Sequence, residues 1–156
     1  MYLHSFPKIE GLEWKEILMM DNPFIKTEET KLKLYQNYLK EVGTGSDELI
    51  EEVGYWRKAN QIHYWFVQNI QNGEDDCRSY LVTKENLQCL YDLCGKVLTN
   101  NSSAPELLPT TPGFFFGSLA YDYFYEMEIS QTYSLIENLL KTFHFDSHYL
   151  IYTSSW

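Results

Sequence analysis

The sequence has few cysteines, and none of them is paired at the spacing of a metal or redox site. Its three cysteines are Cys77, Cys89 and Cys94, and no two of them form a CxxC motif. A disulfide framework and a cysteine-based zinc site are therefore excluded. We expect three reduced thiols, and Cys94 in particular lies on an apolar stripe that argues against an activated thiolate.

Long apolar runs are also absent. A membrane-spanning helix needs roughly 18 or more consecutive apolar residues, and the sequence contains no such run. The first residues, MYLHSFPKIEG, lack the basic start, the apolar run and the cleavage site of a secretory signal. We therefore expect neither export nor insertion into a membrane.

Basic residues are scarce. The chain has 12 Lys and Arg against 22 Asp and Glu, which gives a formal net charge of −10. Such a charge repels nucleic acids and anionic membranes over most of the surface, so we expect no direct binding to either. A local basic pocket for a phosphate group is still compatible with this composition.

The common catalytic signatures are missing. The sequence contains no GxxxxGK[ST], GxGxxG, HExxH or GxSxG motif, so it lacks the parts of a phosphate loop, a dinucleotide fold, a zinc protease and a serine hydrolase. His144 and His148 are four residues apart, but a strand is expected to begin between them, which favours two independent histidines over a metal site. No catalytic residue, metal site or cofactor is predicted.

What the sequence does contain is material for one α+β domain. Its 156 residues, 44% of them apolar, suffice for a core without cross-links. Residues 1–45 are expected to form a peripheral strand and helical segment, and residues 46–156 the main domain. We predict a small, mostly antiparallel sheet packed on a long central helix with two further helices. Strands are expected at 1–6, 78–82 and 148–153, and helices at 13–20, 31–42, 47–70, 84–98 and 123–143.

The expected helix over 47–70 contains the most distinctive segment, GYWRKANQIHYWFV at 54–67. At 100° per residue, Trp56 and His63 fall on one apolar stripe with Asn60 on its edge, and Arg57 projects toward Tyr64. A buried Asn or His without a hydrogen bond costs about 1–3 kcal/mol, so each needs a partner. Either the partner is protein, and the residues fasten a neighbouring loop, or it is a bound ligand.

The ligand hypothesis places a pocket between this helix and the segment 113–122. GFFFGS at 113–118 is either a buried strand or an aromatic loop, and its glycines permit close approach of a ligand or of another backbone. Arginine and aromatic rings together suit a nucleotide-like anion. The predicted ligand-binding residues are Trp56, Arg57, Asn60, His63, Tyr64, Ser118 and Tyr121.

Three blocks of the sequence resemble a family of small, functionally uncharacterised proteins of tailed phages and prophages. They are EEVGYWRKANQIHYWFV, then DDC followed by SYLVTKENLQCLYDLC, then LLPTTPGFFFGSLAYDYFY with a terminal SSW. The resemblance covers residues 48–156 in order and carries no assigned catalytic or binding residues. It implies an accessory protein made in the cytoplasm of a bacterial host, and such proteins often counter host defence.

Three functions are compatible with these observations. The leading hypothesis is a non-enzymatic binding protein that sequesters a nucleotide-like anion, with counter-defence as its biological role. The second is an interaction module that inhibits a bacterial host or defence protein through its acidic and aromatic surface. The third, an enzyme that processes nucleotides with His63 as acid–base, lacks a second catalytic group. A homo-oligomer is compatible with all three.

Overall fold

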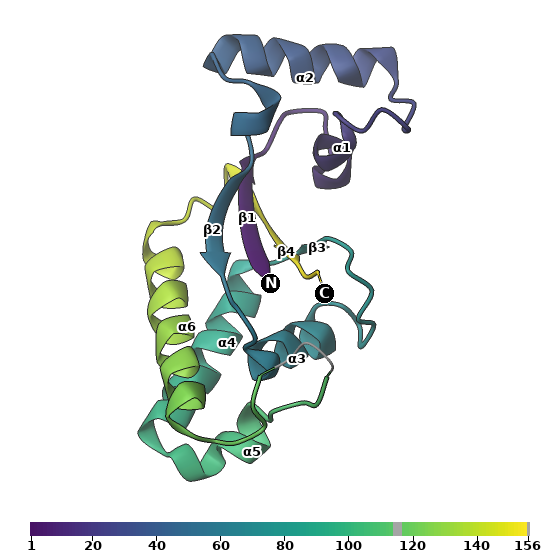
Figure 1. Ribbon diagram of the computed structural model, residues 1–156. Coiled ribbons are helices and arrows are strands. Elements are labelled where there is room, and N and C mark those ends of the chain that lie inside the picture. The colour runs from purple at the N-terminus through teal and green to yellow at the C-terminus, as the bar shows by residue number, and fades with distance from the viewer. Residues whose placement is uncertain (114–116, 156) are drawn as a thin grey trace.

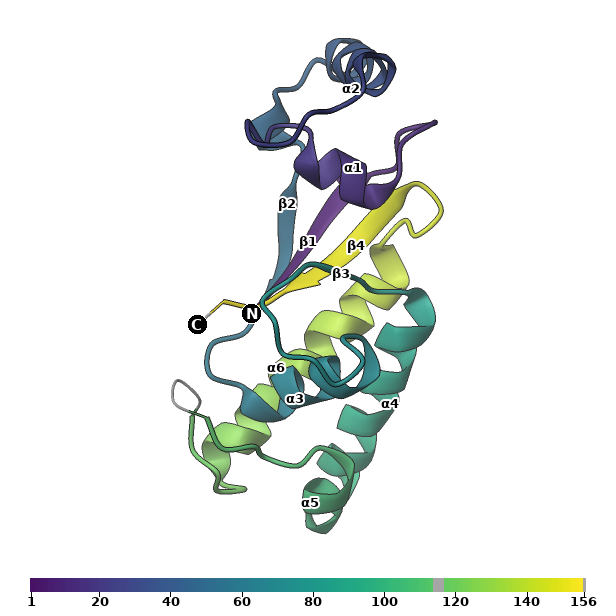
Figure 2. The ribbon, with the colours of Figure 1, turned by 90° about the vertical axis from the view of Figure 1, so that its right-hand side faces the viewer.

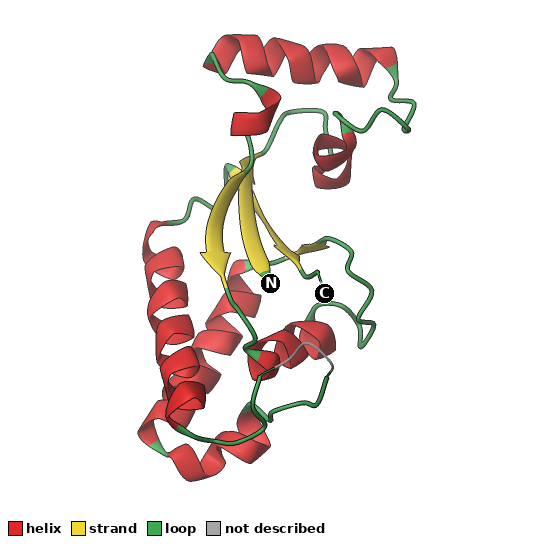
Figure 3. Ribbon diagram, viewed as in Figure 1, coloured by secondary structure: helices red, strands yellow, loops and turns green. Residues whose placement is uncertain are grey.

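The computed structural model describes residues 1–113 and 117–155, and within them it is an α+β protein with one antiparallel sheet (Figures 1 and 3). The strands are β1 (Tyr2–Pro7), β2 (Glu51–Tyr55), β3 (Tyr80–Leu81) and β4 (His148–Thr153). The α-helices are α1 (Trp14–Met19), α2 (Glu29–Val42), α3 (Asn60–Asn69), α4 (Lys84–Thr99), α5 (Ala104–Leu107) and α6 (Tyr123–Thr142). This confirms the predicted fold class.

The sheet has the order β2-β1-β4-β3, and every neighbouring pair is antiparallel. Tyr2 pairs with Tyr55 of β2 on one side and with Thr153 of β4 on the other. The first strand is therefore an interior strand of the sheet and not the peripheral element that we expected. The proposed division near residue 45 stays a prediction.

Helices cover the two faces of the sheet unequally. Leu3, Leu150 and Tyr152 pack on α3, α4 and α6 in the larger core, and Figure 2 shows α4 and α6 running beside each other under the strands. Phe6 and Ile151 point to the opposite face, where α1 and α2 build a smaller core at one end of the elongated molecule (Figure 1).

Several helix ends are where the sequence places them. Thr83 is the N-cap of α4, and its hydroxyl accepts a hydrogen bond from the Asn86 amide at 3.2 Å. Asp122 begins α6 and accepts from the amides of Phe124 and Tyr125. Gly43 ends α2 with a φ of 71°, a left-handed conformation that glycine adopts without strain.

The predicted continuous helix over 47–70 is wrong. Residues 51–55 form β2 instead, and helix begins only at Asn60. Two residues distinguish β2 from the helix that follows it. Gly54 lies in the strand, where a Cβ would be only 3.0 Å from the Leu135 side chain. Lys58, between the strand and the helix, has a φ of 65°. A left-handed residue cannot continue a helix, and pairing with the distant β1 outweighs the helical spacing of the apolar residues.

No helix in the described part of the chain is long and apolar enough to cross a membrane.

Candidate functional site

The segment that leads from β2 into α3 packs against the loop before α6. Asn60 at the start of α3 is buried and holds this loop with both ends of its amide. Its Oδ1 accepts a hydrogen bond from the Thr111 amide at 2.9 Å, and its Nδ2 donates to the Ser118 carbonyl at 3.0 Å. The Gly117 amide also donates to the Lys58 carbonyl. The structure thus places the two predicted segments together, and the groups of Asn60 bond to protein.

His63 joins three parts of the fold. The side chain is 3% exposed, with Nδ1 2.6 Å from the Tyr152 hydroxyl and Nε2 2.9 Å from the Asp75 carboxylate. Since a carboxylate only accepts, Nε2 carries a proton, and in the neutral imidazole the Tyr152 hydroxyl then donates to Nδ1. Burial raises the pKa of Tyr152, which keeps this donor protonated. These contacts connect α3, β4 and the acidic loop at 74–76.

Trp56 is likewise bonded within the protein. Its indole nitrogen donates to the Thr132 hydroxyl of α6 at 2.9 Å, and that hydroxyl donates in turn to the Glu128 carbonyl. The indole ring packs beside Phe66 with ring centroids 5.7 Å apart. Trp56 therefore anchors the β2–α3 connection to α6.

The remaining predicted residues are dispersed. Tyr64 is half-buried on α3, and the Tyr121 hydroxyl accepts from the Thr110 amide at 3.2 Å. The amides of Phe124 and Tyr125 in the first turn of α6 bond to Asp122, so these two donors are not offered to a ligand. Part of the GFFFGS segment, residues 114–116, lies outside the described residues. None of Asn60, His63, Tyr64, Ser118 and Tyr121 lines the hollow that Trp56 and Arg57 share.

An open hollow of about 480 Å³ lies on the other side of this connection, between residues 55–59 and α6. Trp56 and Arg57 line it, and they are the only two of the seven predicted residues that do. The lining that the sequence did not predict comes from the end of β2, from the residue before α3 and from one face of α6: Tyr55, Ala59, Met127, Glu128, Gln131 and Leu135. Residues 127, 131 and 135 are four positions apart, so their side chains lie on the same face of a helix. This spacing was the feature of the sequence that could have indicated the lining.

Glu128 is the chemically unusual group of the hollow. Partial burial raises the pKa of its carboxyl above the ordinary value, although a hydrogen bond from Gln61 Nε2 at 2.8 Å counteracts the effect. Arg57 at the rim is exposed and makes no hydrogen bond or ion pair with any described residue. The hollow thus pairs a partly desolvated carboxylate with one accessible guanidinium.

The structure also bears on the cysteines and on metal binding. Cys94 is fully buried, and desolvation raises the pKa of its thiol to about 12, so it is no nucleophile. No three His, Cys, Asp or Glu side chains gather into a metal-binding group within residues 1–113 and 117–155.

Comparison with protein families, with curated proteins and with solved structures finds no match for this chain. The resemblance to phage proteins therefore stays a prediction.

Proposed function

We propose that this protein is a non-enzymatic interaction module that binds a bacterial protein through the first half of α6 and the adjoining hollow. The observation that carries the proposal is a set of exposed apolar side chains on one short stretch of helix. Tyr123 is 73% exposed, Phe124 64% and Met127 36%. We call these three residues the α6 face. Side chains of this kind supply much of the binding free energy at protein interfaces.

Charge favours a basic partner. Residues 97–140 contain neither Lys nor Arg, whereas Asp122, Glu126 and Glu128 lie on or next to the α6 face. A partner segment with Lys or Arg between apolar residues would complement this surface, and charge complementarity would also speed its association.

The hollow gives the basic side chain a specific place. Met127 belongs both to the α6 face and to the hollow, so the two are continuous. A Lys or Arg that enters there meets the Glu128 carboxylate, which lacks a cationic partner among the described residues. Pairing with a cation offsets the cost of keeping that carboxylate partly buried. The Arg57 guanidinium can bond a carbonyl or carboxylate of the same partner.

The resemblance to phage proteins supplies a biological setting for the proposal. The partner would be a protein of the bacterial host, and a defence protein is the candidate that this setting favours. Sequestration of a nucleotide-like anion beside Arg57 is a second proposal. It has less support here, because Glu128 repels an anion and because the polar groups of Trp56, Asn60 and His63 already bond to protein.

The experiment that tests the proposal places a photo-crosslinking amino acid at position 124 in cells of the host type. Phe24, which is 95% exposed in the segment between α1 and α2, is the matched control position. We expect a specific crosslinked product from position 124 and none of that size from position 24. The same product from both positions, or none from position 124, would contradict the assignment.

A further inference from the structure

A separate hollow of about 570 Å³ lies between α1 and the short edge strand β3. Its lining comes from two segments that are far apart in the sequence: Trp14, Lys15, Leu18, Met19 and Asn22, and then Cys77, Arg78, Ser79, Tyr80 and Leu81. The volume falls within the range of roughly 300–1,000 Å³ that small-molecule sites occupy. Met19 and Leu81 are exposed beside it, so the protein leaves apolar surface in contact with water there.

The charge of this hollow differs from that of the whole molecule. Lys15 and Arg78 line it, and none of the described lining residues is acidic, although the chain has a net charge of −10. Lys15 Nζ lies 5.2 Å from the centroid of the Trp14 ring. An anion bound there would meet two cations beside an aromatic surface.

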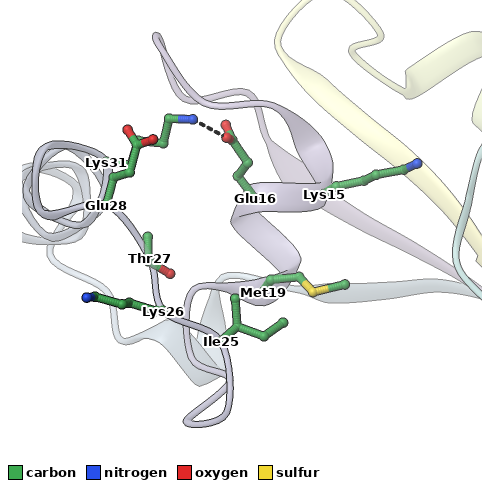
Figure 4. A pocket seen from close by; sticks show the side chains of 8 residues that line it. All are labelled: Lys15, Glu16, Met19, Ile25, Lys26, Thr27, Glu28 and Lys31. Carbon is green, nitrogen blue, oxygen red and sulfur yellow. Dashed lines mark hydrogen bonds and ion pairs between the residues drawn. The ribbon is translucent and has the colours of Figure 1, made fainter.

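The neighbouring hollow around residues 25–31 differs from the α1–β3 hollow in charge, because acidic side chains line it (Figure 4). Two carboxylates, Glu16 and Glu28, line it together with its lysines, and Lys31 forms an ion pair with Glu16. Lys15 lies between the two hollows, and its side chain points away from the Lys31–Glu16 pair (Figure 4). The ammonium group of Lys15 is therefore not neutralised by these carboxylates.

Asp76 fixes the other wall. It accepts a hydrogen bond from the Tyr80 hydroxyl at 2.9 Å and lies 3.3 Å from Arg78 Nε. Nε is the nitrogen that faces Asp76, and the two terminal nitrogens of Arg78 make no hydrogen bond to a described residue. The Arg78 side chain is 77% exposed, so these nitrogens are accessible. A phosphate or carboxylate can receive two parallel hydrogen bonds from such a guanidinium.

We infer that the α1–β3 hollow binds a small planar anion, an aromatic ring that carries a phosphate or carboxylate. Trp14 and Tyr80 contact the ring, Leu18, Met19 and Leu81 cover its edges, and Lys15 and Arg78 bind the acidic group. The site is independent of the α6 face, because no residue is shared between them.

Adenosine 5′-monophosphate is a suitable probe. Its binding is followed by the NMR signal of the Trp14 indole N–H, and the variant Trp14→Phe identifies that signal. We expect a saturable shift of this signal, with the indole signals of the buried Trp56 and Trp65 unchanged. Adenosine and inorganic phosphate, which each lack one half of the probe, should bind at least about tenfold more weakly.

The double variant Lys15→Gln/Arg78→Gln should weaken binding of the probe by about tenfold or more. Lys26→Gln/Lys40→Gln removes the same charge from exposed positions outside the hollow and should bind as the wild type does. Both variants change exposed side chains, and unchanged spectra elsewhere show that they fold. The inference is overturned if neither adenosine 5′-monophosphate nor 1-naphthyl phosphate moves the Trp14 signal, or if Lys15→Gln/Arg78→Gln binds normally.

Discussion

At the scale of single residues, the buried polar side chains of the segment 54–67 connect parts of the fold through hydrogen bonds. Asn60 bonds to the Thr111 amide and to the Ser118 carbonyl, and His63 joins a tyrosine to a carboxylate. The sequence alone already required partners for both, because neither can be buried without hydrogen bonds. It could not say whether those partners were protein or ligand, since no motif connects Asn60 and His63 with Thr111, Ser118, Asp75 and Tyr152.

Asn60→Ala tests the fastening role. It removes the partner of the Thr111 amide and of the Ser118 carbonyl, so we expect a loss of about 1–3 kcal/mol in the free energy of unfolding. The exchange of the Thr111 amide hydrogen should also accelerate. Urea unfolding and NMR hydrogen exchange measure the two effects. Asn69→Ala, a change of the same kind at an exposed position on α3, is the control, and an equal loss for both variants would refute the role of Asn60.

The cysteines should differ in reactivity. Cys77 and Cys89 are exposed, whereas Cys94 is buried and burial raises its pKa to about 12. In the folded protein at pH 8 we expect two thiols to react with a soluble disulfide reagent, with Cys94 slower by on the order of 100-fold or more. All three should react in denaturant. Rapid labelling of Cys94 in the native protein would show that the α4–α6 core opens.

Glu128 links stability to function at a single residue. Because burial raises its pKa, the folded state binds this proton more tightly than the unfolded state does. The charged carboxylate therefore lowers the free energy of unfolding. This loss of stability is fully present above the pKa of the folded state and disappears as the pH falls below the ordinary pKa of a glutamate, near 4.5. Glu128→Gln should therefore stabilise the fold at pH 7.5 and have little effect at pH 4, as measured by urea unfolding.

The same variant should bind the partner less well, since it removes the charge in the hollow. Glu41→Gln, at an exposed position on α2, serves as the control and should alter neither property. If Glu128→Gln lowered both stability and binding at pH 7.5, Glu128 would be a structural residue and the hollow would lose its proposed role.

At the scale of elements, caps and local periodicity identified most of the fold. Thr83 and Asp122 marked the starts of α4 and α6, and the apolar spacing after each of them predicted the helix that follows. β2 was missed for a physical reason. Its stability comes from pairing with β1, some fifty positions earlier in the chain, and single-sequence periodicity does not report contacts at that range.

This error also affected the site. The single helix predicted over 47–70 put Trp56 and His63 on one apolar stripe with Asn60 on its edge, and it put Arg57 on the neighbouring side, at the same predicted pocket. The left-handed Lys58 instead turns the chain, so Arg57 reaches the hollow beside α6 while Asn60 and His63 face the interior. The exposed α6 face was not recognised because its aromatic residues continue a helical pattern that is also typical of a buried helix.

The start of α6 is a further testable feature at this scale. Asp122→Ala removes the acceptor of two first-turn amides, and we expect a loss of about 1 kcal/mol in the free energy of unfolding. Ser130→Ala, at an exposed position within the same helix, should be nearly neutral. Urea unfolding of both variants provides the comparison, and a loss that does not exceed that of Ser130→Ala would show that this cap does not stabilise the helix.

At the scale of the whole molecule, the two proposed binding regions belong to different parts of the fold. The α6 face and its hollow belong to the helix that packs in the larger core, whereas the α1–β3 hollow is lined by residues next to the smaller core. Figure 1 shows α6 and α1 in different parts of the molecule. Their charges also differ, since one contains carboxylates and the other is lined by Lys15 and Arg78. Under the two proposals, a protein of net charge −10 would bind a basic protein segment and a small anion at separate places.

The most direct test of the interaction module is the affinity for the crosslinked partner once it is purified. The dissociation constants of the wild type, of Tyr123→Ser/Phe124→Ser/Met127→Ser and of Phe24→Ser should be compared by calorimetry. We predict that the triple variant folds normally and binds at least about a hundredfold more weakly, about 2.7 kcal/mol, while Phe24→Ser binds as the wild type does. A triple variant that retained the affinity of the wild type would contradict the account.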